Sequence, residues 1–98
     1  MDPQTIKIAG IGYEVKEVEN LEDQFNLLGQ ILYTRGIIQL EKNLPPDRKV
    51  QVFVHEVLHG IFFEAGYEEQ DEEMIDRVAK VLYQVLKDNN IVFERGDG

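Results

Sequence analysis

Cysteine is absent from this chain of 98 residues, and histidine occurs only twice. Without cysteine the protein can form neither a disulfide nor a thiolate metal site, which is consistent with a reducing, cytoplasmic environment. Basic residues are also few: 10 lysines and arginines against 19 aspartates and glutamates give a formal charge of −9. Because binding to a phosphate backbone needs a basic surface, we expect no nucleic-acid partner.

Long apolar runs are missing as well. No stretch approaches the roughly 18 apolar residues of a membrane-spanning helix, so we expect no membrane partner. Residues 1–4 lack the basic patch and apolar core of a secretion signal, and a cytoplasmic location is therefore expected. The whole chain, residues 1–98, has the size of one domain with a single core and leaves no room for a second.

The two histidines lie four residues apart around a glutamate, in the sequence VHEVLHG at residues 54–60. Residues four apart share one face of a helix, so the imidazoles of His55 and His59 can bind a single Zn²⁺. Glu56 is placed to take a proton from zinc-bound water, as in the His-Glu-x-x-His motif of metallopeptidases. The alternative is a pair of hydrogen-bonded, half-buried histidines. We favour zinc because both of the histidines in the chain have ligand spacing.

Apolar residues around this motif recur at steps of three and four, which predicts an amphipathic helix: Val50, Phe53, Val54, Val57, Leu58, Ile61 and Phe62. Pro46 suits the first turn of such a helix, and Gly66 can adopt the left-handed conformation that follows its end. We therefore predict a buried helix from about Pro46 to Ala65. Gly60 costs about 1 kcal/mol inside a helix relative to alanine. It indicates a close backbone or substrate approach, unless it is simply tolerated.

The residues before the motif predict two hairpins, one over residues 5–16 and one over residues 30–41, the second turning at Arg35-Gly36. Residues 18–24 are polar without a clear period and are expected to form a connection.

After the motif, an apolar stripe predicts a second helix from about Asp71 to Asp88: Ile75, Val78, Ala79, Leu82 and Leu86. Strands followed by helices favour an α+β fold, with a small, mainly antiparallel sheet packed on two helices.

Residues 89–98 are expected to form a C-terminal tail, in which the apolar residues 91–94 pack as a strand or over a groove.

Catalytic zinc takes three protein ligands and one water, so the third ligand in a chain with two histidines and no cysteine must be a carboxylate. On the second predicted helix, Glu72 lies at the edge of the apolar stripe, which makes it the first candidate, with Glu73 the next. A solvated carboxylate is the alternative reading for Glu72. Asp76 follows Glu72 by four residues and can orient a histidine ring from behind. Asp71 is more simply explained as a helix cap.

The sequence HEVLH at residues 55–59, followed by EEMID at residues 72–76, resembles the gluzincin pattern of His-Glu-x-x-His with a downstream Glu-x-x-x-Asp. More narrowly, it is similar to the ImmA/IrrE-type metallopeptidases and the small phage-associated proteins near them, over roughly residues 28–86. In that family the sequence near the third ligand often reads Ala-Asn-x-Phe-Ala, where this chain has IDRVA. Longer members carry extra domains, and their regulatory roles do not transfer.

This resemblance implies a zincin-like domain with zinc ligands at His55, His59 and Glu72, a general base at Glu56, and Asp76 behind the ligands. We therefore expect a zinc-dependent metallopeptidase acting on a peptide or protein substrate. The alternative is a catalytically silent or latent zinc-stabilised structural or interaction protein of phage origin. A metal-free helical hairpin with a fortuitous motif is the third possibility.

Two parts of a peptidase site are harder to place from the sequence. An extended substrate could pair with a strand edge near residues 30–34. For stabilising the oxyanion, Tyr33 and Tyr67 are candidates. Tyr83 lies roughly 16 Å along the predicted helix from Glu72, too far for both to serve one centre.

Overall fold

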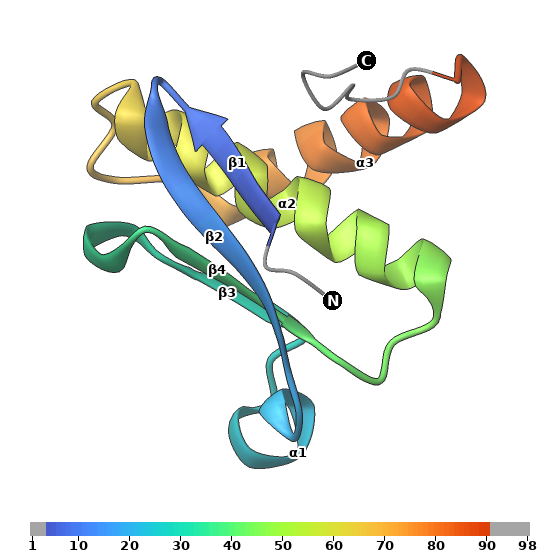
Figure 1. The fold of residues 1–98 in the computed structure, drawn as a ribbon. Helices are drawn as coiled ribbons and strands as arrows, with labels where there is room; N and C mark the ends of the chain where they lie inside the picture. The colour runs from blue at the N-terminus through green and yellow to red at the C-terminus, as the bar shows by residue number, and fades with distance from the viewer. Residues whose placement is uncertain (1–3, 91–98) are drawn as a thin grey trace.

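The computed structural model describes residues 4–90, and its elements are shown in Figure 1. In chain order they are β1 (Gln4–Ile8), β2 (Ile11–Val18), α1 (Leu21–Phe25), β3 (Gly29–Leu32), the 3₁₀ turn η1 (Tyr33–Arg35), β4 (Ile37–Glu41), α2 (Pro46–Glu64) and α3 (Glu72–Asp88). The four strands form one sheet, and the two long helices follow it in the chain, so the predicted α+β class is confirmed. The apolar tail predicted at residues 91–94 lies outside the described residues.

Both predicted hairpins are confirmed. β1 and β2 pair antiparallel across a two-residue turn in which Ala9 and Gly10 both have positive φ, 53° and 82°, as a tight hairpin turn requires. β3 and β4 also pair antiparallel. The hairpins join through one parallel contact between β2 and β4, with Val15 opposite Ile38, and the strand order is β1-β2-β4-β3. The sheet is therefore mainly antiparallel, and β3 is an edge strand.

The connection predicted over residues 18–24 contains a short helix, α1, that the sequence pattern did not reveal. Leu21 is buried there at 2% exposure. The carboxylate of Glu41, itself buried at the end of β4, accepts hydrogen bonds from the backbone N–H of Glu22 (2.8 Å) and of Asn43 (3.1 Å). The start of α1 thus depends on an acceptor from β4, nineteen residues along the chain, which residues 18–24 alone could not supply.

These backbone hydrogen bonds hold the pKa of Glu41 below its usual 4.5. A carboxylate whose pKa is lower in the folded state stabilises the fold above its unfolded pKa, and that contribution is lost as the pH falls through the folded value. We therefore expect Glu41→Gln to lower stability at neutral pH and to weaken the loss of stability below pH 4.5. Urea unfolding across this range measures both effects, with the exposed Glu14→Gln as control. Parallel acid curves for Glu41→Gln and wild type would contradict this role.

α2 covers one face of the sheet. The buried core under it consists of Ile8, Tyr13, Ile38 and Leu40. The hydroxyl of Tyr13 donates a hydrogen bond of 2.6 Å to Glu64, which ties β2 to the last turn of α2. A Cβ atom on Gly60 would lie 2.7 Å from Cδ1 of Ile8 and 3.0 Å from Cδ1 of Ile31. The glycine therefore marks the close approach of sheet side chains to the helix, not of a substrate.

α3 packs mainly on α2, through a second buried cluster of Leu58, Ile75 and Ala79. Both helices begin and end within one residue of their predicted bounds. Asp71 caps α3, as predicted, by accepting from the backbone N–H of Glu73 (3.0 Å) and Met74 (3.3 Å). Val78 was predicted in the buried stripe but is 45% exposed, because α2 covers a narrower face of α3 than the apolar pattern spans.

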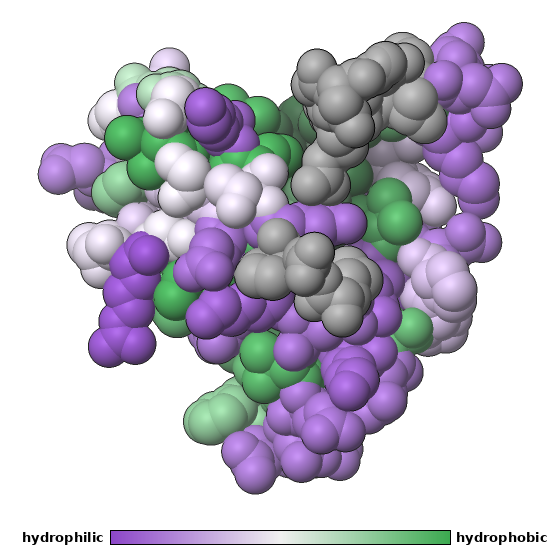
Figure 2. Space-filling model, in the orientation of Figure 1, coloured by the Kyte–Doolittle hydropathy of each residue, from purple (hydrophilic) through white to green (hydrophobic). Residues whose placement is uncertain are grey.

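The face of the molecule turned to the viewer in Figure 2 carries apolar residues in its upper left, around β1 and the end of α2, and polar residues over most of its lower part. Among the described residues, no helix is long and apolar enough to cross a membrane.

Candidate metal centre

Three side chains converge where the start of α3 crosses the second half of α2. Nε2 of His55 lies 3.1 Å from Nε2 of His59. Oε1 of Glu72 lies 3.2 Å from the first of these nitrogens and 3.3 Å from the second. Both histidines are half-buried and Glu72 is exposed. The three atoms thus form a nearly equilateral triangle, and two helices supply them.

This triangle has the dimensions of one face of a tetrahedral metal site. Zinc bonds of about 2.0–2.1 Å place the ligand atoms of a regular tetrahedron about 3.3–3.4 Å apart. The observed separations of 3.1, 3.2 and 3.3 Å match that spacing without further movement of the helices. The group formed by His55, His59 and Glu72 could therefore bind a metal ion.

The hydrogen bonds behind His59 determine which of its nitrogens carries the proton. Nε2 of Gln70 donates to the backbone carbonyl of His59 at 3.3 Å, which fixes the orientation of the Gln70 amide. Oε1 of Gln70 must then accept from Nδ1 of His59, at 2.7 Å. In the neutral ring this leaves a lone pair on Nε2, directed at the triangle.

Asp76 has the same effect on His55. Its Oδ1 atom lies 3.2 Å from Nδ1 of His55 and favours a proton on that nitrogen. Nε2 of the neutral ring then also carries a lone pair toward Glu72. When both rings are neutral, two imidazole nitrogens and one carboxylate oxygen thus meet with no proton between them, an arrangement that a bound cation stabilises. The predicted position of Asp76 behind a histidine agrees with this geometry.

Glu73, the second candidate for the third ligand, points elsewhere. Its carboxylate accepts from Arg77 at 3.0 Å on the exposed side of α3. Of the two neighbouring glutamates, the structure therefore brings only Glu72 to the histidines. Adjacent residues of a helix point about 100° apart, and a sequence pattern with two neighbouring acids does not show which of them faces the histidines.

Gln70 is the functional residue that the sequence did not reveal. It lies in the connection between the helices, where no periodicity marks a buried face, and it reaches His59 because this connection folds back over α2. Its Nε2 atom also donates to the hydroxyl of Tyr33 at 3.3 Å. Gln70 thus links η1 to the three side chains of His55, His59 and Glu72, called the metal-binding cluster below because they could hold an ion.

We expect Gln70→Ala to weaken zinc binding by about 10- to 100-fold, the usual effect of removing a partner that orients a ligand. The free His59 ring could rotate and change its tautomer. Competition with a metal chelator measures the affinity, and Gln84→Ala, which removes an exposed amide from the same groove, is the control. Equal affinities for the two variants would rule out an orienting role for Gln70.

Glu56 faces the same groove from the sheet side of α2 and is only 8% exposed. Burial raises the pKa of its carboxyl, and the nearby histidines partly oppose this shift. A carboxylate with a raised pKa binds a proton more readily, as general-base catalysis near neutral pH requires. The predicted base therefore lies beside the cluster and outside the triangle of possible ligands.

Of the two candidate tyrosines, Tyr33 lines the groove, as does Tyr83, which the sequence placed too far from Glu72 to serve the same centre. The ring of Tyr33 stacks on Phe63 at a centroid distance of 4.3 Å. Burial raises the pKa of Tyr33; its hydrogen bond with Gln70 opposes this shift, and the charges of Glu56 and Glu72 add to it. Tyr67 is 59% exposed and packs on Phe62 instead. Tyr33 is thus the tyrosine that meets the Gln70 network at the metal-binding cluster.

The cluster lies in a groove of about 910 Å³ between β3, α2 and α3. Gly29, Gln30 and Ile31 form one wall, and these residues belong to the edge strand of the sheet. The edge predicted near residues 30–34 is therefore a strand edge over residues 29–32 that no other strand within residues 4–90 covers, and beyond it the chain turns into η1. An open strand edge beside a metal-binding cluster can hold an extended chain.

Comparison with known proteins gives no match to a protein-family model, to a curated sequence or to a solved structure.

Proposed function

We propose that this protein is a zinc-dependent metallopeptidase. The observation that carries the proposal is the convergence of His55, His59 and Glu72. Gln70 and Asp76 bind the Nδ1 atoms of the two histidines, so that the lone pairs of both Nε2 atoms and of the carboxylate point at one position. Two imidazoles and one carboxylate favour Zn²⁺ over the hard cations that prefer oxygen ligands. Three ligands also leave a fourth position of the tetrahedron for water or substrate, as in catalytic zinc sites and unlike closed structural ones.

When bound, zinc would supply a Lewis acid that polarises the scissile carbonyl and lowers the pKa of water. Glu56 takes the proton from the attacking water and passes it to the leaving amine. Its burial excludes solvent, and its raised pKa suits both steps. Tyr33, with its hydroxyl held protonated beside Gln70, is the residue that donates a hydrogen bond to the developing oxyanion.

A peptide is the substrate class that fits this groove best. The free backbone N–H and C=O groups of an edge strand offer a ladder for an extended chain. In this molecule that edge, at Gly29–Leu32, lines the groove that contains the cluster. A substrate strand paired with β3 would carry its backbone past Glu56.

One observation favours a second candidate, a zinc-stabilised protein without turnover. α3 packs mainly on α2, through few buried side chains, and the cluster joins these two helices. Metal binding would therefore hold the helical pair together even if no substrate were cleaved. Such a protein binds zinc but hydrolyses nothing.

Cleavage of an unfolded protein distinguishes the two. We expect zinc-loaded protein to cut a denatured, unstructured substrate, a chelator to stop cleavage, and added zinc to restore it. Circular dichroism in parallel shows whether the chelated protein stays folded. Full zinc occupancy with no cleavage of any unfolded substrate would favour the structural alternative.

A further inference from the structure

The groove has a basic end away from the metal-binding cluster. Arg48 on α2, and Lys80 and Lys87 on α3, line this end. They are three of only 10 lysines and arginines in a chain with a formal charge of −9. Asp88 also lines this end, where it accepts a hydrogen bond from Gln84. The local excess of positive charge is therefore opposite to the charge of the molecule.

Helix geometry places these cations along the two helices that hold the metal-binding cluster. Arg48 precedes His55 by seven residues, two turns of α2, so it lies on the same face as the histidine. Lys80 follows Glu72 by eight residues on α3. The helices run antiparallel, since the end of α3 meets the start of α2, where Nζ of Lys87 lies 3.9 Å from Asp47. Arg48 on α2 and the two lysines on α3 therefore lie at the same end of the groove.

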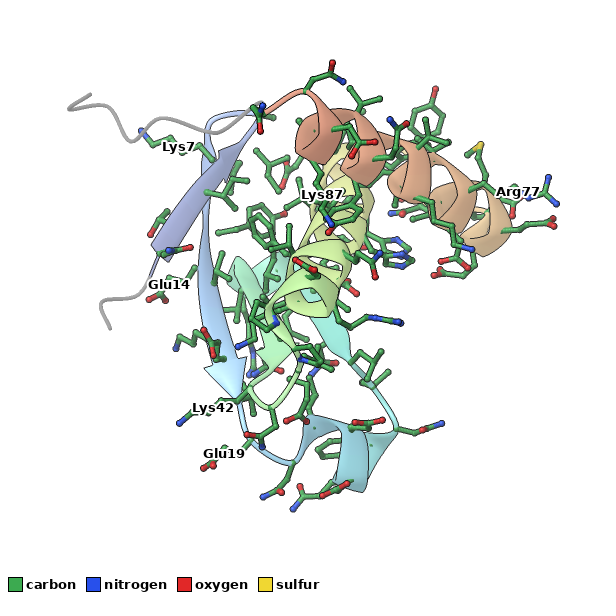
Figure 3. The ribbon with its side chains drawn as sticks, turned by 90° about the vertical axis from the view of Figure 1, so that its right-hand side faces the viewer. Lys7, Glu14, Glu19, Lys42, Arg77 and Lys87 are labelled. Carbon is green, nitrogen blue, oxygen red and sulfur yellow. The ribbon has the colours of Figure 1, made fainter. Side chains whose placement is uncertain are left out.

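These charges are available to a ligand. Within residues 4–90, neither Arg48 nor Lys80 forms an ion pair, and both are exposed. Lys87 makes only a long contact with Asp47, and its side chain is 54% exposed. It also lies over the ring of Tyr83, at 5.7 Å from the centroid. In Figure 3, Lys87 lies between α3 and α2, whereas Arg77 points outward from α3 into solvent.

We propose that this basic end binds a carboxylate of the peptide substrate, and so selects peptides with a negative charge at a set distance from the scissile bond. Seven to eight helical residues span about 10–12 Å, which an extended peptide covers in about three residues. This inference rests on the proposed peptidase function. The carboxylate can come from an aspartate or glutamate side chain or from the C-terminus of the peptide. Both sources present the same group to Arg48 and Lys80.

The test measures peptide binding by fluorescence anisotropy with the Glu56→Gln protein, zinc-loaded and metal-free, so that binding is read without hydrolysis. A neutral ten-residue peptide is compared with versions carrying one glutamate or one lysine at each position in turn. A second pair of neutral peptides differs only in a free or amidated C-terminus. We expect a suitably placed carboxylate to strengthen binding by about five- to tenfold, and high salt to reduce the gain.

The double substitution Arg48→Gln and Lys80→Gln should abolish this preference, whereas Arg77→Gln, outside the groove, should leave it intact. A gain from internal glutamate identifies a side chain as the ligand, and a gain only from the free C-terminus identifies the terminal carboxylate. Equal binding of all peptides, preference for lysine, or no binding would overturn the inference. If the wild type cleaves peptides but the protein binds acidic and neutral peptides equally, the peptidase proposal stands and the carboxylate-binding site is rejected. If the protein prefers acidic peptides but the wild type cleaves none, the carboxylate-binding site stands and the peptidase proposal is rejected.

Discussion

Replacing Glu72 with alanine is expected to leave the purified protein with little or no zinc, whereas the wild type is expected to carry about one zinc per chain. The carboxylate is the only one of the three converging groups that comes from α3. Without it, two imidazoles remain on one helix, too few for a stable tetrahedral site. The loss in affinity should exceed the roughly 10- to 100-fold that removal of an outer partner costs.

The neighbouring glutamate provides a matched control for this experiment. Glu73→Ala removes the same charge from the same turn of α3, but its carboxylate pairs with Arg77 and does not face the histidines. Metal analysis after purification without chelator should therefore find normal zinc in Glu73→Ala. Thermal unfolding gives a second readout, since zinc should raise the melting temperature of wild type and Glu73→Ala alone. Equal zinc content in the two variants would exclude Glu72 as a ligand.

Replacing Glu56 with glutamine is expected to lower peptide hydrolysis by at least about 100- to 10,000-fold while zinc content stays near that of the wild type. The magnitude is that of losing a general base. Glutamine has nearly the same shape as glutamate but cannot accept the proton of the attacking water. Because Glu56 lies outside the triangle of possible ligands, its amide should leave metal affinity intact.

Glu64→Gln is the control for this second substitution. Glu64 belongs to the same helix but is bound by Tyr13 on the sheet side, away from the groove. The Glu64→Gln protein should therefore hydrolyse peptides at the wild-type rate. Cleavage by Glu56→Gln at the wild-type rate would show that another group activates the water. Loss of both zinc and hydrolysis would mean that Glu56 supports the metal site itself.

Much of the local structure could be predicted because it depends on neighbouring residues. Alternation of apolar and polar residues predicted the strands of the first hairpin, and two runs rich in β-forming residues predicted those of the second. The glycine turns at Gly10 and Gly36, both with positive φ, predicted the hairpins. Steps of three and four apolar residues predicted α2 and α3 to within one residue. The spacing of His55 and His59 placed two imidazoles on one helical face for the same reason.

Contacts between distant parts of the chain were beyond prediction from local patterns. The parallel pairing of β2 with β4 joins hairpins that have no sequence signal for each other. α1 depends on the Glu41 carboxylate about twenty residues farther along the chain. The exposure of Val78 depends on how much of α3 is covered by α2.

By itself, the sequence predicted a candidate metal site: two histidines at helical spacing, a glutamate between them, and a carboxylate as the third ligand. The tertiary structure alone decided between Glu72 and Glu73, brought Gln70 and Tyr33 to the cluster, and assembled the groove with its basic end. The physical reason is that ligand spacing within one helix follows from 3.6 residues per turn. The meeting of two helices and a strand depends on packing over the whole core.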